Sequence, residues 1–166
     1  MKSIKGIIFL LASVIIYLNA ASQNAMINIL TQHSGMVKKG ETVFLEVTIS
    51  NTTQYPSIEN YKIKVHISVP SPIAVIREKG HVLPEGWTIS SNTGSSLFLS
   101  NGTDVIPPHS NRTILISILG NKTGGPSTII GQLSFSNGIS PGMEPGSLQG
   151  DLTADNSSTT SIKVVR

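Results

Sequence analysis

Residues 61–69 read YKIKVHISV, and this stretch decides the fold class. Apolar and polar side chains alternate along it; the apolar members are Tyr61, Ile63, Val65, Ile67 and Val69. Successive side chains of a β-strand point to opposite faces of the sheet, whereas a helix would spread these residues around its whole circumference. The stretch is therefore predicted to be an antiparallel strand with one buried face and one face in water.

The same two-residue period recurs along the chain, and no helical period is found after the first segment. Turn-forming residues separate the alternating stretches, and 37–41 and 120–126 are predicted to be connections between strands. The predicted strands are 26–31, 42–50, 61–69, 73–76, 87–90, 96–99, 112–119, 127–136 and 158–165. Residues 26–166 are thus expected to form a single all-β domain, an immunoglobulin-like β-sandwich of about seven to nine antiparallel strands.

The first segment has the three-part pattern of a secretory signal peptide. A basic start with two lysines is followed by a mainly apolar run over 6–18 and by the small or polar residues 19–22. A membrane anchor is the alternative, but it needs about 20 apolar residues, and this run is shorter and lacks a basic flank on its far side. Residues 1–21 are therefore predicted to be a cleaved signal peptide, with the cut near Ala21.

Charge and cysteine content exclude several classes of protein. The chain has 12 Lys and Arg residues against 9 Asp and Glu, and loss of the two lysines in the signal leaves 10 against 9, a net charge of +1. This balance gives no reason to expect a nucleic-acid partner. The chain has no cysteine, so neither disulfides nor thiolate metal sites can form. After signal cleavage, no stable membrane insertion is expected.

The sequence offers no convincing catalytic or metal constellation. Residues 138–142 match the G-x-S-x-G pattern of a nucleophile elbow, but the prolines and glycines that follow exclude the helix this geometry needs. No histidine pairs with another ligand at the i, i+4 spacing of zinc sites. His66 is expected to be solvated on the polar face of its strand, and His33 and His109 fall in predicted turns; His81 is the fourth histidine. The chain is interpreted as a non-enzyme without metal or cofactor.

For two sets of polar residues we favour a structural interpretation over a functional one. Asp151, Asp155 and Asn156 could offer oxygen ligands to calcium, but they lack the spacing of a calcium loop and precede a strand, where such residues commonly form turns. Five asparagines head N-x-[ST] sequons, which are glycosylation sites in a eukaryotic secreted protein and turn residues in a bacterial one: Asn51, Asn101, Asn111, Asn121 and Asn156.

Trp87 is the single tryptophan of the chain. An exposed tryptophan can stack on a sugar ring or anchor an interface, which makes Trp87 the candidate ligand contact. The favoured alternative is a buried plug at one end of the sandwich, with the indole N–H bonded to a backbone carbonyl.

Several short segments give the chain a family likeness. Residues 37–51 (VKKGETVFLEVTISN), 83–87 (LPEGW) and 155–164 (DNSSTTSIKV) resemble the opening turn and strand, a leucine-proline-x-glycine element and the closing strand of bacterial DUF11-type, immunoglobulin-like surface domains. The opening is also similar, to a lesser degree, to cohesin-type domains. The resemblance implies an exported bacterial protein of the cell envelope. The Asn/Thr-rich composition is similar to that of surface proteins from the Bacteroidetes.

These observations lead to three hypotheses about function. The first is an exported, non-catalytic interaction or adhesion module with a protein or surface-glycan partner, which acts in the periplasm, at the cell surface or as a released protein. A carbohydrate-binding module with Trp87 at its site is the second, and an unrecognised hydrolase is the third.

Overall fold

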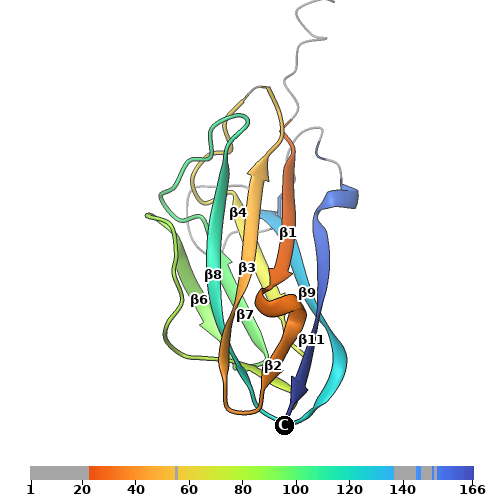
Figure 1. The fold of residues 1–166 in the computed structure, drawn as a ribbon. Coiled ribbons are helices and arrows are strands. Elements are labelled where there is room, and N and C mark those ends of the chain that lie inside the picture. The colour runs from red at the N-terminus through yellow and green to blue at the C-terminus, as the bar shows by residue number, and fades with distance from the viewer. Residues whose placement is uncertain (1–22, 55, 137–144, 147–150, 152) are drawn as a thin grey trace, which may run out of the picture.

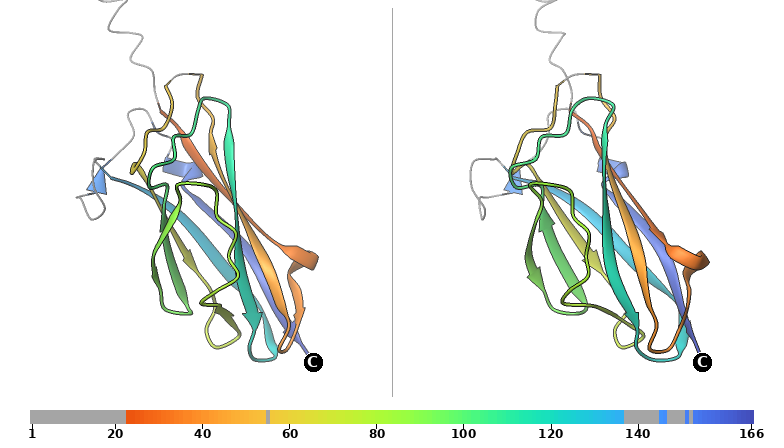
Figure 2. Two further views of the ribbon diagram at one scale, coloured as in Figure 1. Left: turned by 90° about the vertical axis from the view of Figure 1, so that its left-hand side faces the viewer. Right: turned by 60° about the vertical axis from the view of Figure 1, so that its left-hand side comes forward.

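The structure is a computed structural model that describes residues 23–54, 56–136, 145–146, 151 and 153–166. Two sheets face each other and enclose the core (Figures 1 and 2). The smaller sheet has the order β1-β3-β8-β5. Its strands are β1 (Ala25–Thr31), β3 (Thr42–Asn51), β8 (Asn111–Gly120) and β5 (Ala74–Ile76).

The larger sheet has the order β2-β11-β9-β4-β7-β6, with β10 paired to β9. Its strands are β2 (Met36–Lys38), β11 (Ser157–Val165), β9 (Gly124–Ser136), β4 (Ile63–Ser68), β7 (Ser96–Ser100), β6 (Thr88–Asn92) and β10 (Pro145–Gly146). All pairings are antiparallel except that of β2 with β11. The predicted immunoglobulin-like β-sandwich is confirmed, although the described residues form eleven strands rather than seven to nine and one pairing is parallel. None of the described helices is long and apolar enough to span a bilayer.

Strand β4 has the two faces that its alternation predicts. Ile63, Val65 and Ile67 are fully buried, and the side chains between them are partly exposed. The strand lies between β9 and β7, so its apolar row sits in the middle of the sheet. It begins at Ile63 rather than at Tyr61, because Tyr61 has a positive φ of 56° and donates its N–H to the carbonyl of Gly102.

The core is mainly aliphatic, and a glycine in β9 allows the two sheets to approach closely. The largest fully buried side chains are all Ile or Leu: Ile29, Leu45, Ile49, Ile58, Ile63, Ile67, Ile76, Leu97, Leu99, Ile106, Ile114 and Ile116. Each stabilises the fold by roughly 1.5–3 kcal/mol relative to an exposed side chain. A Cβ at Gly131 of β9 would lie 2.8 Å from Cγ2 of Ile29 on the facing sheet, so this glycine allows β1 to approach β9.

Two sequence predictions about connections were wrong. Residues 37–41 were expected to be a turn, but residues 36–38 form β2, which pairs in parallel with β11 and buries Val37. A strand of three residues is too short to display its period. Residues 120–126 were expected to break the chain, but β9 already begins at Gly124. Gly125 and Pro126 lie opposite Lys163 in an irregularity of the β9–β11 register, which accommodates a proline that cannot donate a ladder hydrogen bond.

Candidate functional site

A row of side chains crosses the outer face of the larger sheet and marks the candidate site. His66 of β4 lies opposite Phe98 of β7 on one side and opposite Gln132 of β9 on the other. Gln132 in turn lies opposite Ser157 of β11. Since facing residues of paired strands point the same way, four strands bring these four residues to one surface.

The aromatic members of this row form a stacked pair. The ring centroids of His66 and Phe98 lie 4.3 Å apart, and their planes differ by 2°. Phe98 is 40% exposed, so the pair stands on the outer face and adds nothing to the core between the sheets. Exposed aromatic side chains next to hydrogen-bonding groups are a common feature of binding surfaces.

A groove of about 450 Å³ runs beside the pair. Its lining residues are neutral or weakly basic and mostly able to hydrogen-bond: His66, Phe98, Gln132, Leu133, Ser134, Asn156 and Ser157. Two of them carry a buried polar atom that has no hydrogen-bond partner, namely Nε2 of His66 and Oδ1 of Asn156. Buried polar atoms in folded proteins normally have a partner, so these two lining residues each keep a polar atom that an incoming group could engage.

The structure corrects one prediction about this site. His66 was expected to be a solvated imidazole on a polar face. It does lie on the outer face, but Phe98 covers one side of its ring and its Nε2 atom is buried. The difference arises because the neighbours of His66 come from β7 and β9, and the sequence of β4 alone does not show which residues they are.

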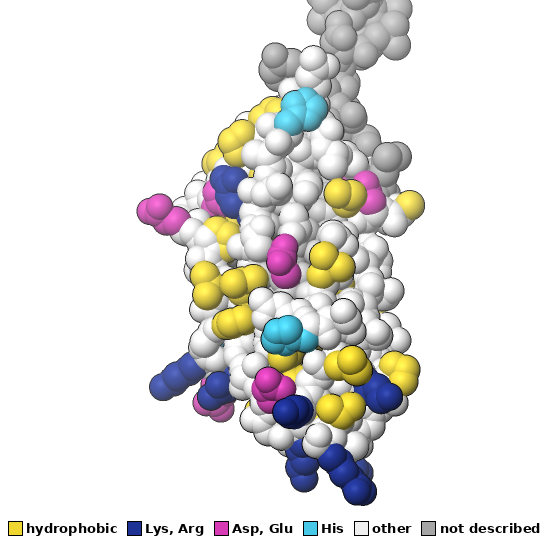
Figure 3. Space-filling view, in the orientation of Figure 1, with side chains coloured by type: hydrophobic (Ala, Val, Ile, Leu, Met, Phe, Trp, Pro, Cys, Tyr) yellow, Lys and Arg dark blue, Asp and Glu magenta, His cyan; other side chains and the backbone are white. Residues whose placement is uncertain are grey.

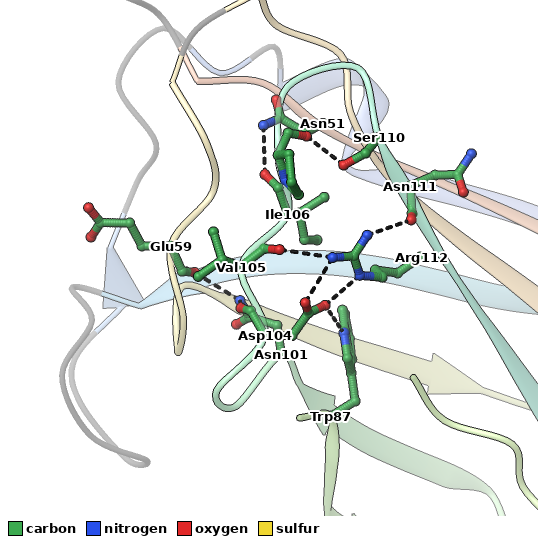
Figure 4. Close-up of polar contacts among 11 residues, drawn as sticks. Asn51, Glu59, Trp87, Asn101, Asp104, Val105, Ile106, Ser110, Asn111 and Arg112 are labelled. Atoms are coloured by element: carbon green, nitrogen blue, oxygen red, sulfur yellow. Dashed lines mark hydrogen bonds and ion pairs between the residues drawn. The ribbon is translucent and has the colours of Figure 1, made fainter. Parts of the chain in front are cut away.

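Trp87 lies in a polar network at one end of the sandwich (Figure 4). The side chain is 5% exposed, and its indole Nε1–H donates to Oδ2 of Asp104 at 2.8 Å. Arg112 donates two hydrogen bonds to the same carboxylate, from Nε at 2.7 Å and from Nη2 at 2.9 Å. This placement matches a buried plug, although the indole partner is a carboxylate rather than the predicted carbonyl. The candidate ligand contact at Trp87 stays a prediction.

Two of the sequon asparagines hold loops together inside the same end of the fold. Asn51 and Asn101 are 1% and 0% exposed. The Nδ2 atom of Asn101 donates to the carbonyls of Glu59 and Asp104, and that of Asn51 donates to the carbonyls of Pro56 and Ile106. An Nδ2 atom with both hydrogens engaged in the interior cannot carry a glycan in the folded chain.

The acidic residues before β11 connect this segment to the beginning of β1. Oδ1 of Asp151 accepts from the backbone N–H of Ala25, and Oδ2 of Asp155 accepts from the side chain of Asn24. Asn156 donates to Oδ2 of Asp151. These contacts suit the favoured turn interpretation. Across the described ranges, no three His, Cys, Asp or Glu residues gather closely enough to hold a metal ion.

The remaining candidate residues do not join this site. His33 and His109 both adopt positive φ angles; His109 lies in a turn, as expected, whereas His33 lies in the short 3-10 helix η1 (Gln32–Gly35). The G-x-S-x-G match at 138–142 and the predicted signal peptide with its cut near Ala21 lie outside the described residues. Phe98, Gln132 and Ser157, which complete the groove, were missed because each is an ordinary residue in its own strand, and only the strand register brings them beside His66.

His81 gives the domain a predicted sensitivity to acid. Its Nδ1 atom accepts the backbone N–H of Ser117 at 3.1 Å. Burial lowers the pKa of His81 from its ordinary value of 6.5, partly offset by a hydrogen bond to the backbone of Arg77. The folded state therefore binds fewer protons at this site than the unfolded state. The resulting stability is complete above pH 6.5 and is lost as the pH falls through the lowered folded-state pKa.

We expect the urea midpoint to fall between about pH 7.5 and pH 5, and to fall less in His81→Gln, whose side chain does not titrate. The difference between the two proteins isolates His81 from the carboxylates that they share. An identical pH dependence in both would show that His81 titrates alike in the folded and unfolded states.

Comparisons with known proteins show a likeness of fold but do not assign the chain to a family. No protein-family model and no curated protein matches the sequence. A cohesin module from a Clostridium perfringens family 33 glycoside hydrolase aligns with a TM-score of 0.50 at 12% identity, over 87% of this chain and 98% of that one. An uncharacterised Nocardia farcinica protein with an immunoglobulin-like fold has a TM-score of 0.45 at 15% identity, over 82% and 98%. The collagen-binding domain of a Staphylococcus aureus adhesin has a TM-score of 0.40 at 10% identity, over 87% and 99%.

At 12% identity, the match to the cohesin module shows a likeness of fold alone. The cohesin-type resemblance of the sequence thus has a counterpart among solved structures, whereas the DUF11-type resemblance remains one of short motifs.

Proposed function

We propose that the chain is an exported, non-catalytic immunoglobulin-like interaction module, with one domain over 26–166 behind a cleaved signal peptide. Its contact surface is the outer face of the larger sheet, where the groove beside His66 and Phe98 receives a protein partner. The observation that carries this proposal is the pairing of an exposed aromatic stack with two buried polar atoms that lack partners. A backbone amide or side-chain amide entering the groove would supply the missing donor and acceptor.

The outer face of the smaller sheet is the rival surface, and it is less suited. Leu30 and Val82 are 55% and 54% exposed there, but Glu46 lies between Leu30 and Leu115 in the register of the strands. In Figure 3, which views this face, the apolar side chains form separate spots among polar atoms. A charged side chain at the centre of an interface is unfavourable unless it is paired.

The test compares matched double substitutions on the two faces. His66→Ala/Phe98→Ala removes the aromatic stack, and Glu46→Ala/Thr48→Ala alters the opposite face to a similar extent. Binding of labelled chain to the surface of the cells that export it is measured for both. We expect the first variant to lose about tenfold or more in affinity, since central aromatic contacts contribute most of an interface energy, and the second to bind as before. Loss in the second variant alone would contradict the proposed surface.

A second candidate function, carbohydrate binding, is favoured by the neutral lining of the same groove. A sugar hydroxyl both donates and accepts and could satisfy His66 and Asn156, while a ring face could contact Phe98. Binding of uncharged oligosaccharides from a glycan panel is expected to be lost in Asn156→Ala and retained in Asn121→Ala, which changes an exposed asparagine elsewhere. Trp87→Phe keeps a ring at position 87, so a specific loss of sugar binding there would instead support Trp87 as the ligand contact.

A further inference from the structure

The described Lys and Arg residues are concentrated at one end of the sandwich. Figure 3 shows most of the dark-blue side chains on this face at the end where Figure 1 marks the C-terminus. Five exposed residues form what we call the basic end: Lys38, Lys39, Lys122, Lys163 and Arg166. They are half of the ten Lys and Arg residues in the described part of the chain.

Three segments far apart in the sequence build the basic end. The N–H of Lys39 donates to the carbonyl of Val165 at 2.9 Å, and the N–H of the next residue donates to the carbonyl of Gly120 at 2.8 Å. Lys122 follows two residues after Gly120 and is held by a hydrogen bond from its own N–H to the carbonyl of Ile73. The two-sheet fold therefore fixes these cations beside one another.

Acidic side chains also lie at this end, but they are fewer than the basic ones (Figure 3). Glu41 is the acidic residue of the same turn, and its Oε2 accepts the backbone N–H of Lys38. The ion pair formed among the described residues is that of Arg112 with Asp104, and none of the five basic-end cations pairs with a described acid. Asp104, Asp151 and Asp155 lie toward the other end, where β1 begins. The small net charge thus hides a strong separation of charge along the sandwich.

We propose that the basic end binds the phosphate-bearing surface of an anionic phospholipid membrane and so orients the domain on it. The cations sit on turns and a strand end, which present a broad tip suited to an extended surface. Four of the five are lysines, which act as point charges toward phosphate. Met36, which is 57% exposed, lies opposite Lys163 in the β2–β11 register and adds apolar area next to the charges. This inference is independent of the groove on the sheet face.

The test measures sedimentation of the chain, purified from the host that exports it, with vesicles of phosphatidylcholine containing about 30% phosphatidylglycerol. Each lysine close to such a surface raises partitioning about fivefold. We therefore expect Lys39→Glu/Lys122→Glu to reduce partitioning by at least about 20-fold. Sodium chloride at about 0.5 M should release the wild-type chain, because the Debye length falls to about 4 Å.

The matched control is Lys62→Glu/Lys64→Glu, which changes the net charge equally at positions outside the basic end. It should retain binding within about threefold, and vesicles of phosphatidylcholine alone should bind neither protein. Equal losses in the two variants would overturn the proposal, because net charge rather than the basic end would then govern binding. Failure of the wild-type chain to bind anionic vesicles, or binding to a sulfated polysaccharide in their place, would also overturn it.

Discussion

Asn101→Ala is expected to destabilise the domain by about 3–5 kcal/mol, a large fraction of the stability of a typical domain. Oδ1 of Asn101 accepts the buried N–H of Ile63 at 3.0 Å, and its Nδ2 donates to the carbonyls of Glu59 and Asp104 at 2.8 Å each. Alanine leaves these groups without partners at a fully buried position. The start of β4 and two loops would lose their common anchor. Urea denaturation followed by circular dichroism measures the effect.

Asn111→Ala is the matched control, because it removes an exposed asparagine that also heads a sequon. It should change the unfolding free energy by less than about 0.5 kcal/mol. Asn101→Asp keeps the acceptor and removes the two donated hydrogen bonds, so it should still destabilise the fold clearly. An effect of Asn101→Ala as small as that of Asn111→Ala would contradict the anchoring role.

Asp104→Ala is expected to cost about 2–4 kcal/mol, since it leaves both the indole N–H of Trp87 and the guanidinium of Arg112 without their shared acceptor. The Asp104 and Arg112 side chains are 11% and 26% exposed, so water compensates only part of the loss. Because Trp87 is the single tryptophan, its fluorescence reports unfolding and the local change together.

A double-mutant cycle separates the ion pair from the rest of the network. Asp104→Ala and Arg112→Ala should be coupled by about 1–3 kcal/mol, whereas Glu85→Ala, which removes an exposed carboxylate, should leave stability nearly unchanged. If the effects of the two substitutions on the free energy of unfolding were additive, the ion pair between Asp104 and Arg112 would contribute nothing to stability.

The nine predicted strands are present, and the long ones show the alternation that a sheet with one buried face imposes on its residues. Strand β2 and the beginning of β9 were missed for a physical reason: each depends on pairing with β11, which is remote in the sequence. Local residue types such as Gly125 and Pro126 favour a turn, and the distant pairing outweighs that preference.

The candidate site was much less predictable than the fold. Trp87 drew attention as a rare residue, yet the structure places it in the core. The groove and the basic end are instead assembled from common residues by strand register and by the meeting of turns. Net charge is a sum over the whole chain, and a motif covers only one short segment. Neither reveals a surface that is assembled from several segments, so the single sequence did not show these two features.

The most direct test of the proposed contact surface is site-specific photocross-linking. A photoreactive amino acid is placed at Gln132, in the groove, or at Glu46, on the opposite sheet face, and the labelled chain is irradiated together with the cells that produce it. The account predicts a discrete covalent adduct from position 132 that disappears when His66 and Phe98 are replaced by alanine. An adduct formed from position 46 and absent from position 132 would contradict it.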